Sequence, residues 1–568
     1  MEQNTEFKNS FADNIFQHKY ANFKGQTWSQ KVDALVTDIT HQHLGAEQHN
    51  GLRDAMRSFK FMPGGRYIYY AGRQARFYNN CYLLKAEEDT REEWGRVGNR
   101  ASDCLMSGGG IGIDYSALRA EGQILTRTGG TSSGPIPLMH TINELGRNVM
   151  QGGSRRSAMY ASLNWKHGDI KRFLIEKDWD REFLPNITYR MAKELDFNFP
   201  APLDMTNISV NYDNDFLEKL YNKPFSELLD IYKVHGHKGI SALPIMHIPD
   251  TFHENTYWAM RNGEPGFSFN FFDRVLETLR NACTEVTSED DSDVCNLGSV
   301  NMGEVDNIKE FEELVELGSE FLVCGTLEAD LPYQKVHEVR RKNRRLGLGL
   351  MGIHEWLLKR GYKYEVTPEL KEWLEVYEKA SERSANKLCD RLGISRPVAY
   401  RAIAPTGTIG ILAGTTTGLE LIYAVAYKRR YLQGKDTWKY EYVIDNTAKL
   451  LIEKYGLDPE SIETAAGMAH TPEKRIAFQA DIQEYVDMAI SSTLNIPEWG
   501  SEINNEDKVA DMAKIVAKYA VRLRGLTFYP DGSRGGQPLT MVPYSEAVGN
   551  IGVVFEDNDA CKGGFCGL

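Results

Sequence analysis

The spacing of hydrophobic positions changes several times along the chain. Over residues 27–44, "TWSQKVDALVTDITHQHL", apolar residues recur with a period near 3.6, and this spacing predicts short amphipathic helices in the first sixty residues. Strand-like runs follow, among them "FMPGGRYIYYAG" (61–72), "FYNNCYLL" (77–84), "GIGIDYSAL" (110–118), "RSAMYASLNW" (156–165) and "RLRGLTFYP" (522–530).

Helical segments separate these runs, at residues 91–106, 369–392 and 508–525. The alternation of strands and helices over more than 450 residues predicts an α/β architecture. Periodicity alone does not separate a closed barrel from an open sheet, and the chain shows no internal repeat.

Size and charge narrow the classes of function. A chain of 568 residues predicts two to four domains or one large barrel with additions. The net charge of -13 disfavours broad binding to nucleic acid or to anionic membranes, yet local arginines can still hold a phosphate. We see no secretory signal and no membrane-length apolar run, which predicts a cytoplasmic protein without nucleic-acid or membrane partners.

Eight cysteines are scattered along the chain, with no CxxC pair and no zinc-like spacing, so we expect no metal site. Two of them lie in "NACTEVTSEDDSDVCNLGSVNM" (281–302), where Glu285 follows Cys283 by two residues. In a strand both side chains would face the same side and could meet one substrate. A cysteine protease would need a nearby histidine, and a zinc site would need more ligands. Buried packing remains the plain alternative.

Glycine-rich segments suggest phosphate binding. They are residues 107–122, 151–159 and 404–420, and the last interleaves glycine with threonine ahead of an apolar run. Each alone is more often an ordinary turn, but together they favour a nucleotide ligand. The chain ends in "EDNDACKGGFCGL" (556–568), whose two cysteines are either incidental or form a mobile dithiol arm.

The order and spacing of several motifs resemble the catalytic (large, α) subunit of ribonucleotide reductase. The motifs are "NNCYL" (79–83), "GGGIGIDYSALR" (108–119), "QGGSRR" (151–156), "NACTE" (281–285), "VCNLGSVNM" (294–302), "RRLGLGLMG" (344–352), "PTGTI" (405–409), "YPDGSRGGQ" (529–537) and the terminal CxxxxC.

This resemblance implies the family's ten-stranded α/β barrel with a central finger loop and flanking helices. The expected divisions are an N-terminal helical segment (1–60), the catalytic barrel (61–540) and a flexible C-terminal redox tail (541–568). A homodimer is expected as well.

The resemblance also assigns a radical reduction of ribonucleoside diphosphates to 2′-deoxyribonucleoside diphosphates. Cys283 would become the thiyl radical that removes the 3′ hydrogen, with Glu285 as base and Asn281 bonding the ribose hydroxyls. Cys81 and Cys295 would form the reducing pair. Cys561 and Cys566 on the tail would re-reduce that pair and receive electrons from thioredoxin or glutaredoxin.

Substrate and effector positions follow from the same resemblance. The substrate phosphates are expected on Pro405, Thr406, Gly407, Thr408 and Ile409, with Asn80, Gly110 and the "PGGR" turn (63–66), which contains Gly64 and Gly65, nearby. Residues 114–134 are expected to bind an ATP or deoxynucleoside triphosphate effector, with Arg119 and Arg155 as the candidate contacts.

Two departures from the family pattern concern regulation and the radical source. Only about sixty residues precede "FMPGGR", so we expect no N-terminal ATP-binding module. The last barrel strand carries Phe528-Tyr529 in place of adjacent tyrosines, and Tyr529 is the candidate for radical transfer. That pair looks like adenosylcobalamin-dependent forms, whereas the compact chain and acidic tail suit a separate dimetal β subunit. Our preference is the β subunit.

Three alternatives remain. One is an adenosylcobalamin-dependent reductase acting on di- or triphosphates. Another is the glycyl-radical type, which would need a terminal glycyl motif and a cysteine-rich zinc site. The third is a nucleotide-binding homologue without catalysis, which should have lost at least one of the key cysteines or Glu285.

Overall fold

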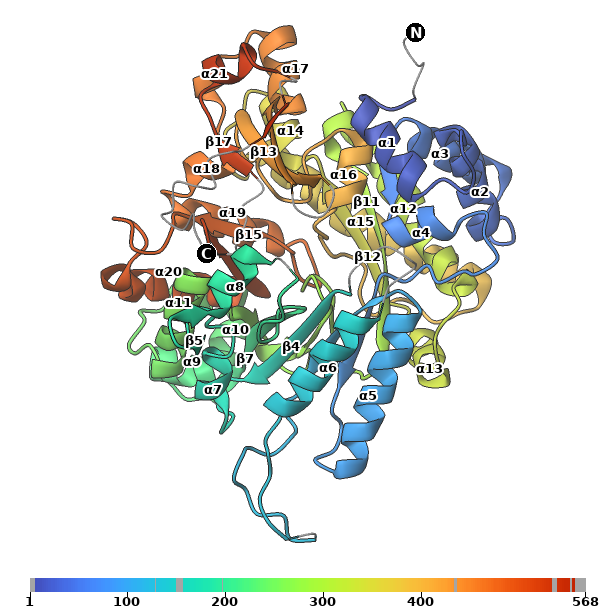
Figure 1. The fold of residues 1–568 in the computed structure, drawn as a ribbon. Helices are drawn as coiled ribbons and strands as arrows, with labels where there is room; N and C mark the ends of the chain where they lie inside the picture. Colours follow the sequence, from blue (N-terminus) through green and yellow to red (C-terminus); the bar gives the residue numbers. More distant parts are fainter. Residues whose placement is uncertain are drawn as a thin grey trace.

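The main sheet has ten strands and lies at the centre of the molecule (Figure 1). The computed structural model describes residues 6–127, 129–149, 157–196, 198–433, 437–533, 539–551 and 554–556. Around the sheet run β1 (Phe61–Pro63), β11 (Asp293–Asn301), β2 (Cys81–Lys85), β3 (Gly110–Asp114), β4 (Met159–Asn164), β7 (Thr206–Tyr212), β8 (Gly266–Phe269), β16 (Gly525–Pro530) and β15 (Thr493–Ile496), while β12 (Leu346–Met351) pairs with β11. The predicted ten-stranded α/β architecture is confirmed.

Two parallel halves make up this sheet. Strands β2, β3, β4, β7 and β8 are parallel neighbours. In the other half, β11 pairs with β12 and β15 with β16 in parallel, and bridges through Arg401 and Ile403 link these two pairs. The halves join antiparallel at β11–β2 and at β16–β8. Parallel pairing requires crossover segments, which explains the helices between most strands.

Helices cover the outside of the sheet. In Figure 1, α5 (Arg91–Met106) and α6 (Ile136–Asn148) lie side by side on the first half. On the second half, α12 (Ile308–Glu328) packs against α15 (Pro368–Leu392). The others are α7 (Ile170–Leu174), α8 (Tyr189–Leu195), α9 (Asn214–Tyr221), α10 (Phe225–Ser241), α11 (Asp250–Asn262), α13 (Gln334–Asn343), α14 (Ile353–Lys359), α16 (Gly407–Ala413), α17 (Asn446–Tyr455), α18 (Ala465–Met468), α19 (Pro472–Gln483), α20 (Val509–Tyr519) and α21 (Tyr544–Val548).

The N-terminal helices share a core with the second half of the barrel. They are α1 (Ser10–Lys19), α2 (Trp28–Thr40) and α3 (Ala46–Arg57). Phe16 and Trp28 are buried in one cluster with Val300 of β11 and Phe321 of α12. No helix in the described ranges has both the length and the apolarity to cross a membrane.

Two segments differ from the prediction. The aromatic run expected as a strand at 61–72 is extended only over β1, and from Gly65 to Tyr70 it is the helix α4, which follows the turn at Gly64. A separate four-stranded sheet was also not foreseen. It consists of β17 (Leu539–Met541), β13 (Ala426–Gln433), β14 (Thr437–Ile444) and β18 (Val554–Glu556). The outer strands β17 and β18 each lie more than a hundred residues after the strand they pair with.

Candidate functional site

The loop that carries Cys283 rises between two short paired strands, β9 (Leu279–Arg280) and β10 (Thr287–Ser288). Its turn is tight, because the Thr284 amide donates to the Asn281 carbonyl at 3.0 Å and Thr284 has a positive φ of 71°. The loop passes very close to β3: a Cβ on Gly112 would lie 1.7 Å from the Arg280 carbonyl oxygen. Only glycine fits at this crossing.

Buried charges fix the foot of this loop. Arg280 is fully buried and donates to the Glu277 carbonyl at 2.6 Å, to Asn270 Oδ1 at 2.7 Å and to the Arg524 carbonyl at 3.1 Å. Arg524 in turn donates to Glu277 Oε2 at 2.7 Å. Burial opposes ionisation of Glu277, but the Arg524 and Arg345 guanidinium groups hold its pKa at about 2. The foot is therefore an ionised network that joins the loop to both halves of the barrel.

The three predicted loop residues face the cysteine pair from the centre of the barrel. Asn281 is buried, and its Nδ2 donates to Cys81 Sγ at 3.4 Å. Its Oδ1 accepts from the Val286 amide at 3.0 Å, which fixes the orientation of the amide group. Cys283 is half-buried at the tip of the loop. The tip thus presents a reachable thiol beside an oriented amide.

Glu285 is a buried carboxyl with an unusual pKa. Its side chain is 1% exposed, and burial raises the pKa to about 7 while a hydrogen bond from Asn281 opposes the rise. Its Oε2 has no hydrogen-bond partner among the described residues. A carboxyl with a pKa near 7 can take up or release a proton at neutral pH, as a general base must.

Cys81 and Cys295 occupy directly opposite positions of the antiparallel β2–β11 pair. Such partners have Cα atoms about 4.5–5.5 Å apart, within the range that a disulfide spans. Both side chains are buried, and burial raises the pKa of Cys295 well above its usual range, so it stays a protonated thiol. The geometry allows these two thiols to interconvert with a disulfide without moving the backbone.

A cavity of about 310 Å³ brings the predicted catalytic and substrate residues together. Cys81, Cys283 and Glu285 line one side of it. The rest of its wall includes every predicted substrate residue, namely Gly64, Gly65, Asn80, Gly110, Pro405, Thr406, Gly407, Thr408 and Ile409. Asn281 and Cys295 lie behind this surface.

The turn at 405–409 has the form of an anion nest. Thr406 has a positive φ of 49° and precedes α16, whose first amides have no partner within the helix. Thr406 Oγ1 accepts from the Gly418 amide at 2.7 Å, which holds the turn. Lys19 Nζ donates to Thr408 Oγ1 at 3.2 Å and brings a positive charge to the same place. Amides and a nearby cation suit a phosphate.

Two polar residues of the cavity wall, Tyr20 and Ser299, were not among the predicted site residues. Tyr20, which follows α1, lies so near the glycine turn that a Cβ on Gly65 would be 2.8 Å from its hydroxyl. Arg66 and Ser299 also line the cavity. Arg66 belongs to the predicted turn at 63–66, whereas Ser299 lies inside the motif "VCNLGSVNM" (294–302) and could have been included. No sequence signal marks Tyr20, because only tertiary packing brings the N-terminal segment here.

The effector and radical-transfer candidates lie elsewhere. Arg119 pairs with Asp89 at 2.6 Å and borders a cavity of about 440 Å³ between the start of α5 and residues 125–133. Tyr529 is half-buried on β16, opposite Asn495 of β15. Arg155, Cys561 and Cys566 fall outside the described residues. Within the described ranges no cluster of three or more His, Cys, Asp or Glu side chains could hold a metal ion.

Comparison with known proteins agrees with this geometry. The family model for the ribonucleotide reductase barrel domain matches residues 79–380 and 378–529. The chain is 25% identical to a vitamin B12-dependent ribonucleoside-diphosphate reductase of Mycobacterium tuberculosis, over 85% of this chain and 72% of that protein. It is 26% identical to a protein of the same name from Thermoplasma acidophilum, over 86% of this chain and 66% of the other.

A third relative is the α subunit of a ribonucleoside-diphosphate reductase from Chlamydia muridarum, 25% identical over 58% of this chain and 33% of that subunit. The Mycobacterium and Thermoplasma relatives, which match 85% and 86% of the chain, are both named for vitamin B12. The preference for a dimetal β subunit as cofactor source and as partner is therefore wrong. The compact chain and acidic tail, on which that preference rested, do not report on the radical source. The matched barrel covers more than half of the chain, which therefore belongs to the ribonucleotide reductase family.

Proposed function

We propose that this chain reduces ribonucleoside diphosphates to 2′-deoxyribonucleoside diphosphates, with Cys283 as the radical residue. One observation carries the proposal: a single nucleotide-sized cavity is bordered by Cys283, Glu285 and Cys81, with Cys295 directly behind. Two buried acceptor atoms, Glu285 Oε2 and Asn80 Oδ1, have no hydrogen-bond partner among the residues that the structure describes, and they suit hydroxyl donors such as those of a ribose. The diphosphate substrate follows the names of the Mycobacterium and Thermoplasma relatives.

The residues divide the reaction between them. Cys283, as a thiyl radical, takes the 3′ hydrogen, and Glu285 accepts the 3′-hydroxyl proton. One thiol of the Cys81–Cys295 pair protonates the 2′ hydroxyl, which leaves as water. The pair then supplies two electrons and its second hydrogen to C2′ and closes to a disulfide. As the pair's electrons reduce the 3′ carbonyl, Glu285 returns its proton to the 3′ oxygen, and Cys283 finally returns its hydrogen to C3′, which restores the radical. The high pKa of Cys295 keeps it protonated before this step.

For the radical source we propose adenosylcobalamin, on the strength of the named relatives. The cofactor would supply the initial radical that oxidises Cys283. The cavity of about 310 Å³ fits a nucleotide and is too small for a corrinoid as well. Hence the cofactor does not fit inside this cavity together with the substrate. Cys283 is half-buried rather than sealed, so a radical donor outside the cavity can reach it.

The test is anaerobic turnover of a ribonucleoside diphosphate by the purified chain with dithiothreitol. We expect deoxyribonucleotide product with adenosylcobalamin and none without it. The variant Cys283→Ser should make no product yet bind the substrate within about threefold of wild type. Product formation by Cys283→Ser, or none by wild type with the cofactor, would refute the proposal.

Regulation and turnover involve further parts of the chain. We propose that Cys561 and Cys566 re-reduce the Cys81–Cys295 disulfide and accept electrons from thioredoxin or glutaredoxin. The cavity at Arg119 is our candidate effector site, because the arginines there suit a triphosphate. A homodimer is proposed on the family resemblance alone.

A further inference from the structure

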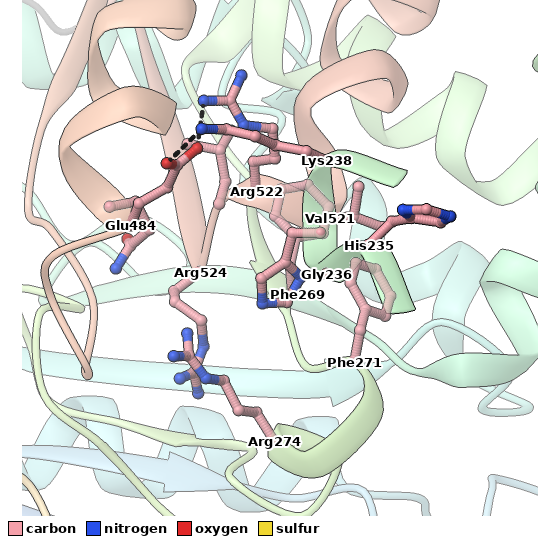
Figure 2. Close-up of a pocket in the computed structure, with 13 residues that line it drawn as sticks. His235, Gly236, Lys238, Phe269, Phe271, Arg274, Glu484, Val521, Arg522 and Arg524 are labelled. Atoms are coloured by element: carbon pink, nitrogen blue, oxygen red, sulfur yellow. Dashed lines mark hydrogen bonds and ion pairs between the residues drawn. The ribbon is translucent and has the colours of Figure 1, made fainter. Parts of the chain in front are cut away.

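A second cavity, of about 250 Å³, lies where α10, the turn after β8 and the start of β16 meet (Figure 2). Its wall includes residues 235–238 of α10, Arg274, Glu484 and residues 521–524. It shares no lining residue with the cavity of about 310 Å³ at Cys283, which we call the nucleotide cavity. Gly236 breaks α10 here with φ 60° and ψ −159°, so that three residues with basic side chains flank one bend. The cavity is therefore a distinct feature of the fold.

Positive charge exceeds negative charge in this cavity. Glu484 pairs with Lys238 at 2.9 Å and with Arg522 at 2.7 Å, as the dashed lines in Figure 2 show. Arg524 pairs with Glu277 at 2.7 Å. Arg274 has no carboxylate within ion-pair distance in the part of the chain that the structure describes. Its positive charge is therefore not neutralised by an ion pair there.

Two arginines of the cavity, the half-buried Arg274 and the buried Arg524, point to a missing anion. In Figure 2 the guanidinium groups of Arg274 and Arg524 face one another. Burial and the charge of Arg274 lower the pKa of Arg524 to about 9, while Glu277 opposes the shift. Like charges held together in a buried place are costly unless an anion lies between them.

Unsatisfied donors mark the same place. Arg524 is 3% exposed, yet its Nε has no hydrogen-bond partner in the described structure. Nδ1 of His237 is likewise buried without a partner. Burial and the charge of Arg274 lower the pKa of His237 to about 4, so this ring is neutral at pH 7 and can donate one N–H or accept one. Buried donors of this kind normally have an acceptor.

We propose that this cavity binds an oxyanion, either phosphate or a small phosphate monoester. Its oxygens would accept from the guanidinium groups of Arg274 and Arg524 and from His237. Arginine pairs are suited to planar, two-point binding of phosphate. The volume of the cavity is large enough for a phosphate that carries a small organic group, but it is too small for a nucleoside diphosphate. This site does not depend on the proposed function of the nucleotide cavity.

The test compares binding of inorganic phosphate, and separately of ribose 5-phosphate, by calorimetry to wild type and two variants. Arg274→Gln removes the positive charge of Arg274 but keeps a long polar side chain at that position. Lys238→Gln removes a charge at the rim of the cavity that Glu484 already neutralises. We expect Arg274→Gln to lose at least tenfold in affinity for one class of site, Lys238→Gln to change less than threefold, and Arg274→Lys to recover part of the loss. We also expect the nucleotide cavity to bind phosphate. The comparison between the variants, and not the total binding, therefore reports on the site at Arg274.

Amide hydrogen exchange locates the site independently. Phosphate should slow exchange in residues 235–241, 271–276 and 521–526 of wild type, and should not do so in Arg274→Gln. If Arg274→Gln binds both ligands as wild type does, if both glutamine variants lose the same affinity, or if these segments show no protection, the proposal is overturned. Binding of ribose 5-phosphate alone would support a monoester as the ligand.

Discussion

Burial of single side chains sets the chemistry of the nucleotide cavity. Glu285 has a pKa of about 7 because its carboxyl is buried, so it is largely ionised only above neutral pH. Cys295 is held as a thiol for the same reason. Sequence patterns predicted which residues lie at this cavity, since the motifs around Cys81, Cys283 and Cys295 are local. They did not predict these pKa values, which depend on neighbours from strands far apart in the chain.

The raised pKa of Glu285 has a consequence for stability. Its favourable contribution is complete below the unfolded pKa near 4.5 and is lost as pH rises through about 7. Because glutamine does not ionise, the variant Glu285→Gln should not lose stability in this way as the pH rises. Between pH 5 and pH 8, the free energy of unfolding of Glu285→Gln relative to wild type should therefore rise by about 3 kcal/mol.

Chemical denaturation at both pH values measures this difference. Glu289→Gln is the matched control, because Glu289 is an exposed glutamate of the same segment, and it should show no such pH dependence. The free energies of unfolding of Glu285→Gln and wild type are compared at each pH. If their difference is the same at the two pH values, ionisation of Glu285 does not destabilise the folded protein, and the prediction is contradicted.

At the scale of elements, the loop of Cys283 is positioned by its foot and by a glycine. The ionised network of Glu277, Arg280 and Arg524 joins β9 to β16, while Gly112 lets β3 pass within contact of the loop backbone. The sequence predicted the loop and the flanking strands from their motifs. It missed the four-stranded sheet, because β13 and β14 carry many polar residues and pair with strands from the end of the chain.

The close crossing at Gly112 leads to a second prediction. In Gly112→Ala the new Cβ would lie 1.7 Å from the Arg280 carbonyl oxygen, so the loop must shift or the strands must part. We expect a loss of at least ~2 kcal/mol in the free energy of unfolding and a fall in turnover of more than tenfold.

Gly98→Ala is the control for this substitution. Gly98 lies within α5, and a Cβ there meets nothing within 4 Å. Because alanine favours helix over glycine, Gly98→Ala should be neutral or slightly stabilising with full turnover. Normal turnover in Gly112→Ala would contradict the positioning role that we assign to this crossing.

For the whole molecule, the two halves of the barrel must cooperate to make the site. Cys81 comes from the first half, Cys295 and the turn at 405–409 come from the second, and Tyr20 comes from the N-terminal helices. The family motifs predicted this assembly except for Tyr20. They did not identify the radical source, since Phe528-Tyr529 and the chain length are consistent with more than one kind of reductase.

The terminal dithiol gives a prediction at this scale. Replacing both Cys561 and Cys566 by Ser should block turnover driven by thioredoxin, because a large protein reductant cannot reach the buried Cys81–Cys295 pair. Turnover with dithiothreitol should persist at a rate within a fewfold of wild type. The two assays, run side by side with adenosylcobalamin, distinguish the outcomes, and normal thioredoxin-driven turnover would rule out the tail as carrier.

The most direct test of the account is a single turnover of the fully reduced chain. The protein is mixed anaerobically with adenosylcobalamin and one ribonucleoside diphosphate, without any external reductant, then alkylated and mapped by peptide mass spectrometry. In the variant that lacks both tail cysteines, we predict about one deoxyribonucleotide per active site and a disulfide between Cys81 and Cys295. If product forms and both Cys81 and Cys295 are still free thiols that become alkylated, the account is contradicted.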